Sequence, residues 1–400
     1  MRARPEAFGA IVALDAPPAL VWVDRAMARA LGVEESPRWD GPEPDTRTLE
    51  GARLSAPTEV HLMTTNRCPA GCPGCYTSAV PESDDATTEA MRAALRAIAE
   101  RGVFHVALGG GESLLRRDLF ALARYARELG LVPNLTTSGI GMSPALAEAC
   151  RVFGQVNVSL DGLGETYRDA RGYDGAERAL RALELLAGAG VPCGINYVLS
   201  ERTWDAVDET LARIAPIGVN EVEFLRFKPA GRGRDVYADY RLSEAHARAL
   251  LPRLLALQRA YPGVHMKIDC SLVPFVCAAD PDAEVLERFG IYGCEAGHAL
   301  AAVTADLVTT PCSFVADPVG GAVEAMAGWE TDARLEEWRT YPERAPEPCA
   351  SCTYRRICKG GCKVVTRHLE GAWFAPDPEC PRVRAHRRGE PFVPVALLCT

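Results

Sequence analysis

The sequence predicts an α/β protein in which a parallel sheet curls into a partial barrel, followed by a cysteine-rich C-terminal domain. Strand-like and helix-like segments alternate between residues 58 and 240, as in right-handed βαβ units. This alternation supplies six strands, which is fewer than the eight of a closed barrel. Eight of the 15 cysteines then fall between Cys294 and Cys399, so the last part of the chain has a different character.

The first 57 residues precede the alternating pattern. Two apolar runs, 10–14 and 19–23, and a helical pattern over 25–31 predict a small hairpin and a helix. A loop rich in Pro, Gly and Asp over 36–45 is typical of a linker. We expect this extension either to steady a peptide by strand addition or to cover an edge of the barrel.

Residues 58–240 are expected to form a (β/α)6, TIM-like partial barrel. Its strands are predicted at 59–64, 105–108, 132–136, 156–160, 193–199 and 221–227, and its helices at 86–101, 114–129, 175–189 and 203–214. The functional face of such a core lies at the C-terminal ends of the strands. A bridging segment with a helix and a strand (241–293), a cysteine-rich domain (294–385) and a tail (386–400) complete the chain.

Composition excludes several classes of protein. The chain is 48% hydrophobic and 24% charged, as in globular proteins, and its net charge of -9 argues against a nucleic-acid partner. There is no apolar run long enough to span a membrane and no signal-peptide pattern. We therefore expect a cytoplasmic protein without a membrane partner, whose thiols stay reduced and available for metals.

The first cysteine group directly follows the first barrel strand. Cys68, Cys72 and Cys75 have the spacing Cys-x3-Cys-x2-Cys. Three thiolates can hold three corners of a [4Fe–4S] cluster, and the fourth iron is then open for chemistry. A zinc knuckle is the alternative, but the position at the C-terminal end of a strand favours a catalytic cluster.

This spacing, in this place, resembles the radical SAM superfamily. The segment Gly109-Gly110-Gly111-Glu112 after the second strand is similar to the GGE motif of that family, and Gly110, Gly111 and Glu112 are therefore implied to contact the amino group of S-adenosylmethionine. Glycines allow a close backbone approach, and a carboxylate suits an ammonium group.

The resemblance implies four further contacts with the cofactor: Ser138, Ser159, Arg171 and Asn196. Arg171 matches the family arginine that pairs with the cofactor carboxylate, a task suited to its forked geometry. The residue before the last cysteine is usually aromatic in the family and contacts the adenine, but it is Gly74 here. Tyr76 follows the last cysteine instead and is the candidate cofactor contact at this place.

The second cysteine group resembles the SPASM domain. Its spacing is Cys-x2-Cys-x5-Cys-x3-Cys over 349–362, with one cysteine after it and two before it. The family pattern implies an outer auxiliary cluster held by Cys349, Cys352, Cys358 and Cys380, and an inner one held by Cys294, Cys312 and Cys362. The fourth ligand of the inner cluster is Cys277, Cys270 or no cysteine, and a zinc ribbon is the alternative for the whole tail.

The resemblance implies an enzyme that reductively cleaves S-adenosylmethionine to a 5′-deoxyadenosyl radical, with an external flavodoxin or ferredoxin as electron donor. SPASM members most often modify ribosomal peptides or protein side chains, which predicts a crosslink, an oxidation or an epimerisation. The alternatives are a sulfatase-maturating enzyme, a small-molecule dehydrogenase or coenzyme-biosynthesis enzyme, and a non-enzymatic electron carrier or zinc scaffold.

The pattern does not fix a catalytic base. Asp269, Glu223 and Asp161 are carboxylates near strand ends that could remove a proton after hydrogen abstraction. Residues of this kind also serve as caps.

Overall fold

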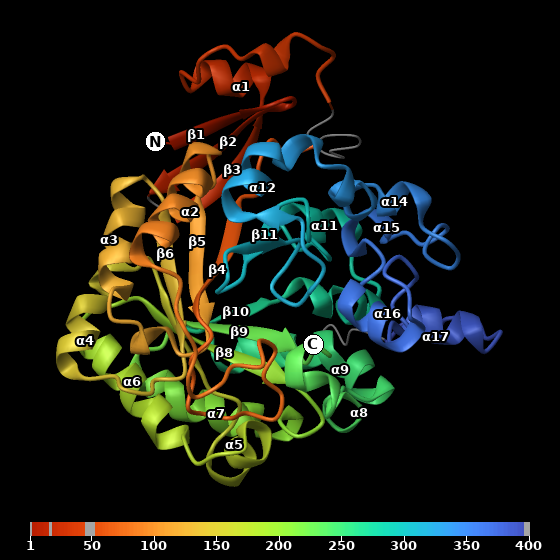
Figure 1. The fold of residues 1–400 in the computed structure, drawn as a ribbon. Coiled ribbons are helices and arrows are strands. Elements are labelled where there is room, and N and C mark those ends of the chain that lie inside the picture. The colour runs from red at the N-terminus through yellow and green to blue at the C-terminus, as the bar shows by residue number, and fades with distance from the viewer. Residues whose placement is uncertain (1, 16–17, 45–52, 396–400) are drawn as a thin grey trace.

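The computed structural model describes residues 2–15, 18–44 and 53–395, and its main feature is a ten-stranded, mostly parallel sheet (Figure 1). The strand order is β10-β9-β8-β7-β6-β5-β4-β11-β12-β13. The sheet bends, so that β8–β10 lie across the direction of β4 and β5, and helices cover its outer side (Figure 1). The predicted partial barrel is confirmed.

The six predicted strands are present and pair in parallel: β4 (Glu59–Thr65), β5 (His105–Gly110), β6 (Val132–Thr137), β7 (Val156–Ser159), β8 (Cys193–Leu199) and β9 (Glu221–Arg226). The helices between them are α2 (Thr88–Glu100), α3 (Leu119–Glu128), α4 (Pro144–Ala149), α5 (Gly164–Arg171), α6 (Ala176–Gly188) and α7 (Val207–Ile214). The sequence pattern did not predict α4 and α5, which have only six and eight residues.

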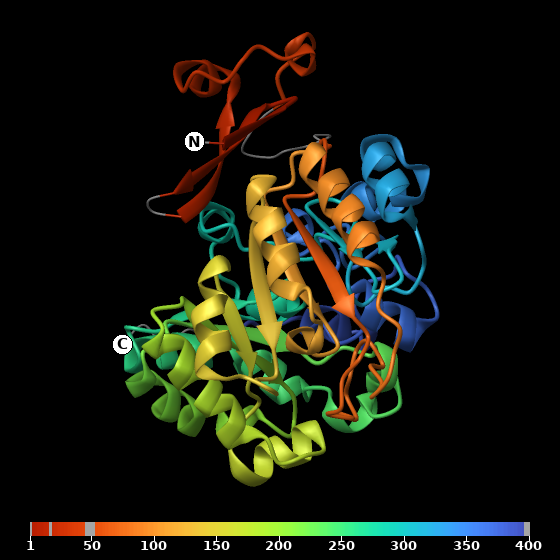
Figure 2. The ribbon, with the colours of Figure 1, turned by 60° about the vertical axis from the view of Figure 1, so that its left-hand side comes forward.

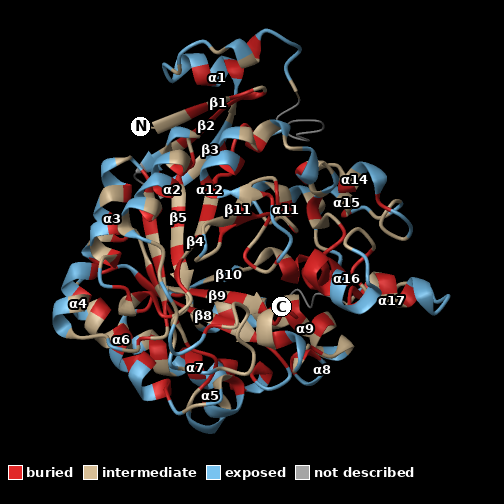
Figure 3. Cartoon of the chain, in the orientation of Figure 1, coloured by how far each residue is buried: buried red, intermediate tan, exposed pale blue. Residues whose placement is uncertain are grey.

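Helix α2 shows how these units pack. The hydroxyl of Thr87 accepts a hydrogen bond from the backbone N–H of Ala90 and caps the first turn. Met91, Leu95 and Ile98 follow one another at helical spacing and are fully buried. The same division holds throughout the barrel, because buried residues concentrate on the strands and exposed ones on the outer faces of helices (Figure 3).

Segments beyond the barrel core extend both edges of the sheet. Strand β10 (His265–Ile268) pairs in parallel with β9, and β11 (Leu300–Val303) pairs in parallel with β4. Two short antiparallel strands, β12 (Val308–Thr310) and β13 (Gly320–Gly321), continue from β11. The cysteine-rich part of the chain therefore shares one sheet with the barrel.

The N-terminal extension forms its own sheet, which stands apart at one end of the barrel (Figure 2). The predicted hairpin, β2 (Gly9–Asp15) and β3 (Pro18–Asp24), and helix, α1 (Arg25–Ala30), are confirmed. A further strand, β1 (Arg2–Glu6), pairs with β2. Arg4 anchors it, because its guanidinium donates to the carbonyls of Ala56 and Pro57 just before β4. The predicted linker carries one 3-10 turn at Pro37–Trp39, and its last residue lies outside the described ranges.

The remaining helices are α8 (Tyr237–Tyr240), α9 (Glu244–Ala260), α10 (Val273–Val276), α11 (Ala283–Arg288), α12 (Ala322–Gly328), α13 (Glu336–Arg339), α14 (Tyr341–Arg344), α15 (Arg355–Cys358), α16 (Lys363–Glu370) and α17 (Pro381–Arg387). No helix in the described ranges is long and apolar enough to cross a membrane.

A buried ion-pair network joins the barrel to the tail. The Arg226 guanidinium at the end of β9 lies 2.6 Å from Asp377 and 2.7 Å from Glu379, and all three side chains are buried. Tyr237 donates a further hydrogen bond of 2.8 Å to Glu379. Buried charges are tolerated only when they are paired, so this network fixes where the tail sits.

We predict that Asp377→Ala lowers the free energy of unfolding by about 3–5 kcal/mol, because it leaves buried positive charge poorly compensated. Urea denaturation of identically reconstituted chains, followed by circular dichroism, measures this. Glu148→Ala, which breaks the exposed pair with Arg151, is the control and should have a much smaller effect. Equal midpoints for the two variants would contradict the prediction.

Candidate functional site

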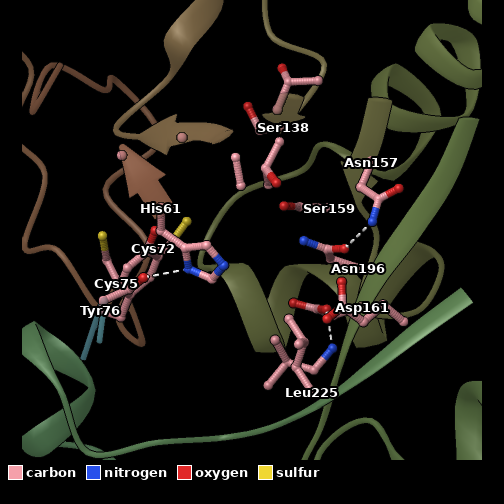
Figure 4. A pocket seen from close by; sticks show the side chains of 18 of the residues that line it. His61, Cys72, Cys75, Tyr76, Ser138, Asn157, Ser159, Asp161, Asn196 and Leu225 are labelled. Atoms are coloured by element: carbon pink, nitrogen blue, oxygen red, sulfur yellow. Dashed lines mark hydrogen bonds between the residues drawn. The ribbon is translucent and has the colours of Figure 1, made fainter. Parts of the chain in front are cut away.

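A cavity of about 570 Å³ opens inside the barrel, lined by residues from β4 to β10 and the loops after these strands. Cys68, Cys72 and Cys75 all line it. Figure 4 shows Cys72 and Cys75 on one side, with Ser159, Asn196 and Asp161 on the other. The structure therefore gathers the predicted first cysteine group and the predicted cofactor contacts at one place.

The first cysteine loop is held by backbone hydrogen bonds. The N–H of Cys68 donates to the carbonyl of Val80 over 2.7 Å. Arg232, in the loop after β9, donates to the carbonyls of Cys72 (3.0 Å) and Ala79 (2.8 Å). The loop following β9 therefore fixes the loop that follows β4.

The three thiols suit a multinuclear group. They are free cysteines on one loop around one cavity. Burial raises the pKa of Cys68 and of Cys72, while the nearby charge of Arg171 opposes this at Cys72. Among the described residues, no three His, Cys, Asp or Glu side chains are gathered closely enough for a single metal ion. Three thiolates on one loop are the donor set of a [4Fe–4S] cluster with one open iron.

The glycines after β5 permit a close contact with the cysteine loop. The N–H of Gly111 donates to the carbonyl of Thr65 (2.8 Å), and that of Glu112 to the carbonyl of Arg67 (2.9 Å). A Cβ at Gly111 would lie 2.3 Å from the Arg67 carbonyl oxygen. Only glycine lets these two loops meet at the cavity.

Glu112 is buried and held from within the protein. Its carboxylate accepts hydrogen bonds from the Thr137 hydroxyl (2.7 Å), the Ser138 N–H (2.8 Å), the Ser138 hydroxyl and the Leu114 N–H (3.1 Å). Burial raises its pKa, and these hydrogen bonds oppose the rise. The structure brings Glu112 and Ser138 together, and the contact with the cofactor ammonium stays a prediction.

Asp161 and Arg171 form a buried pair. Arg171 Nε lies 2.6 Å from one Asp161 oxygen, and the other accepts the N–H of Val198 over 2.7 Å. Asp161 is therefore paired with a cation and held by the backbone, which suits a positioning role better than that of a catalytic base. Its role is to orient Arg171, which lines the cavity.

The polar residues on the next strands also line the cavity. Ser159 ends β7, and Asn196 on β8 accepts a hydrogen bond of 2.7 Å from the amide of Asn157 (Figure 4). The two predicted cofactor contacts therefore lie beside each other. Their contact with a ligand stays a prediction.

Phe227 explains the unusual glycine at position 74. A Cβ on Gly74 would lie 2.6 Å from the Phe227 ring, which itself lines the cavity. The ring therefore occupies space next to the position that is aromatic in the family. Tyr76 packs instead against Phe314 of the tail, with ring centroids 4.8 Å apart. In the sequence, the only indication of this role for Phe227 is that position 74 lacks its usual aromatic residue.

The other two candidate bases differ in their partners. Asp269 pairs with Lys228 and caps the turn at Ser271. In the described part of the chain, Glu223 has no hydrogen-bond or ion-pair partner, since Lys267 pairs with Glu221 instead, at 2.6 Å. Burial raises the pKa of Glu223 to about 7, and the charges of Asp269 and Glu59 add to this.

His61 on β4 is a cavity residue that sequence reasoning missed. Its Nδ1 lies 2.6 Å from the Ser313 hydroxyl and its Nε2 lies 3.4 Å from Glu59. Burial alone would lower the pKa of His61, but the hydrogen bond and charge of Glu59 raise it. Ser313 follows Cys312, so this contact brings the second cysteine group to the wall of the cavity.

The thiols of the second group lie in two places. The four predicted outer ligands, Cys349, Cys352, Cys358 and Cys380, line one small cavity of about 30 Å³. Within the predicted inner set, burial raises the pKa of Cys312 to about 12, and nearby Cys294 and Cys362 contribute. The inner thiols are therefore neighbours of one another.

Comparison with known proteins agrees with this arrangement. The model of the radical SAM superfamily matches residues 62–214. The chain is 30% identical to the pre-heme d1 synthase of Dinoroseobacter shibae over 79% of this chain and 84% of that protein. It is also 30% identical to the PqqA peptide cyclase of Methylocella silvestris, over 79% and 85%. The crystal structure of Streptococcus suis SuiB bound to its precursor peptide SuiA has the same fold, with a TM-score of 0.73, 17% identity and coverage of 95% and 98%.

We predict that Arg171→Ala weakens the binding of S-adenosylmethionine by about 1.5–3 kcal/mol, the scale of one charge-assisted hydrogen bond. Isothermal titration calorimetry on the reconstituted chain measures it. Arg168→Ala is the matched control, because Arg168 lies on the same helix but is exposed. Equal affinity for both variants would reject the role of Arg171.

Proposed function

Because the chain belongs to the radical SAM superfamily and carries a C-terminal SPASM-type domain, we propose that it modifies a side chain of a ribosomal peptide or protein. The modification would be a crosslink, an oxidation or an epimerisation. The observation that carries this proposal is that both cysteine groups reach one cavity, the first through Cys72 and Cys75 and the second through Ser313 and Phe314.

Cys68, Cys72 and Cys75 would hold the catalytic [4Fe–4S] cluster. When bound, this cluster supplies the electron that cleaves S-adenosylmethionine to methionine and a 5′-deoxyadenosyl radical, which takes hydrogen from an unactivated carbon. The protein binds and orients the cofactor around that cluster.

The surrounding residues have separate tasks in this proposal. Arg171, oriented by Asp161, would bind the cofactor carboxylate, and Glu112 would accept its ammonium group. Phe227 offers an apolar ring to the adenine, in place of the aromatic residue that position 74 lacks. Ser159 and Asn196 would bind the ribose or the carboxylate.

Glu223 is the carboxylate best placed to accept the proton that an oxidation or crosslink releases. It lines the cavity and has no hydrogen-bond or ion-pair partner within residues 2–15, 18–44 and 53–395, whereas Asp161 and Asp269 each pair with a cation. A pKa near 7 is well matched to proton transfer at neutral pH.

The surroundings of Glu223 support this choice. The charges that act most on the pKa of Glu223 are those of Asp269, Glu59, His61 and Glu221. Lys267, its neighbour in register on β10, pairs with Glu221. Three of those first four groups are carboxylates, so their negative charges favour the protonated form of Glu223 over its ionised form.

Two observations support a peptide as the substrate. The PqqA peptide cyclase and SuiB, which was crystallised with a precursor peptide, are similar to this chain. Strand β3 is an edge of the N-terminal sheet, because among the described strands it pairs only with β2. Val21 and Trp22 on this strand are exposed. An extended peptide can add to such an edge.

We further propose that the electron comes from an external flavodoxin or ferredoxin, and that the enzyme works in the cytoplasm. A reducing compartment keeps thiols available for clusters, and the described cysteines are all free.

We predict that replacing Cys68, Cys72 and Cys75 together by Ala abolishes formation of 5′-deoxyadenosine while iron remains in the tail. Anaerobic reconstitution, incubation with S-adenosylmethionine and a reductant, and chromatography of the products measure this. The control is Cys150→Ala, since Cys150 is buried beside α4 and far in sequence from both groups. Cleavage at the native rate in the triple variant would refute the proposed site.

We predict that Glu223→Gln lowers peptide modification by about 100-fold or more, the usual contribution of a general base, while 5′-deoxyadenosine still forms. Mass spectrometry of the substrate peptide measures how much of it has been modified. Glu221→Gln on the same strand is the control, because that carboxylate already pairs with Lys267.

The same residue sets a pH dependence. With its pKa raised to about 7, Glu223 is protonated at lower pH and cannot accept a proton. The amount of modified peptide formed per molecule of 5′-deoxyadenosine should therefore increase as the pH rises through about 7 in the native chain. In Glu223→Gln this ratio should not change with pH. If the enzyme instead acts on a small molecule and not on a peptide, it resembles the pre-heme d1 synthase in function more than the peptide cyclase.

A further inference from the structure

A short helical segment after β10 carries two cysteines outside the seven of the SPASM-type pattern. It runs through the 3-10 turn Cys270–Leu272, helix α10 and the 3-10 turn Cys277–Ala279. The two thiols are seven positions apart on helical turns, roughly 10–14 Å along the axis. One segment can therefore present one thiol to each of two neighbouring sites.

The first thiol lies at the inner set. Arg226 donates to the Ser271 carbonyl (3.1 Å) and to Asp377 Oδ2 (2.6 Å), and this same oxygen accepts the N–H of Cys362 (3.0 Å). The backbone next to Cys270 and the backbone of Cys362 are thus held by one buried ion pair.

A second contact ties Cys270 to the Cys312 side of the inner set. Lys228 pairs with Asp269, the residue before Cys270, and its ammonium lies 4.2 Å from the ring centroid of Phe314. Phe314 is two residues after Cys312. Lys228 is itself buried, so it fixes both segments.

The electrostatic neighbours of each thiol agree with this division. Burial raises the pKa of Cys270, and Asp269, Cys294 and Cys362 add to the rise. For Cys277, burial is again the main cause, but the contributing thiols are Cys380 and Cys352. Cys277 also lines the small cavity of the four outer thiols.

We propose that Cys270 is the fourth ligand of the inner auxiliary cluster, completing the set Cys270, Cys294, Cys312 and Cys362. The inference rests on the proposed function in that it takes the tail to hold iron–sulfur clusters. Four thiolates close a [4Fe–4S] cluster, so no inner iron is left to bind the substrate. Substrate then meets only side chains on that wall of the cavity, namely Lys228, Ser313 and Phe314. Cys277 is a fifth thiol beside an outer site already complete with four.

The test compares Cys270→Ser with Cys277→Ser in full-length chains that also carry Ala at Cys68, Cys72 and Cys75. The parent chain then holds only the auxiliary clusters, about eight irons. Iron content and the electron paramagnetic resonance of the reduced clusters are recorded with and without cyanide, a probe of open iron sites. We expect the parent and Cys277→Ser to keep their iron and to give the same spectrum with and without cyanide. Cys270→Ser should respond to cyanide or lose about four irons.

Each other outcome overturns the proposal. A Cys270→Ser chain indistinguishable from the parent, or a cyanide response in Cys277→Ser alone, would remove Cys270 from the ligand set. Should Cys270→Ser fail to fold, the parent and Cys277→Ser decide together. A cyanide response in the parent would mean an open inner cluster and overturn the proposal, and a response or a loss of iron in Cys277→Ser would assign the fourth ligand to Cys277 instead.

The readout does not depend on catalysis. Zinc in place of iron in the parent would refute the cluster assignment and this inference with it. A native chain that forms 5′-deoxyadenosine but has a cyanide-sensitive auxiliary cluster would refute the inference alone.

Discussion

The buried charge of Arg226 is the constraint on which the arrangement of this protein depends. A guanidinium inside a protein needs anionic partners, and here they come from Asp377 and Glu379, some 150 residues further along the chain. The same group also binds the Ser271 carbonyl. The end of β9, the segment that carries Cys270 and the last cysteine loops are therefore fixed around a single point. An apolar substitute could fill this volume, but it would not specify the register of three segments.

Roles in the cavity follow from partners and not from residue type. Asp161 and Asp269 follow the ends of β7 and β10, and Glu223 lies within β9. All three are carboxylates of the barrel, yet two of them neutralise a neighbouring cation. Asp161 holds Arg171 toward the cofactor side, while Asp269 holds Lys228 toward the tail. Of these three carboxylates, Glu223 is the one without an ion-pair partner among the residues that the structure describes, and burial raises its pKa. Environments that separate chemically similar groups in this way are a common basis of acid–base assignment in enzymes.

Local pattern was sufficient wherever a short stretch of chain contains the whole signal. The six barrel strands, the first cysteine loop and the turn at Gly111 were predicted because strand periodicity and motif spacing are local. Strand β1 was missed, since its Arg4 and Glu6 look solvent-exposed in sequence but pair with each other and with residues 55–57. Phe227, His61 and the distribution of Cys270 and Cys277 could not be predicted either. Each depends on contacts between segments far apart in the chain, and the periodicity of a local sequence carries no information about such contacts.

The parallel pairing of β11 with β4 has a consequence for how the chain matures. Strand β4 is synthesised early, but its outer neighbour lies about 240 residues later. Contacts at such separation form slowly, because a long loop must close before they are gained. During synthesis the β4 edge is therefore an unpaired strand, a surface prone to aggregation. The first cysteine loop directly follows β4, so the proposed cluster site is synthesised long before this edge of the sheet is covered.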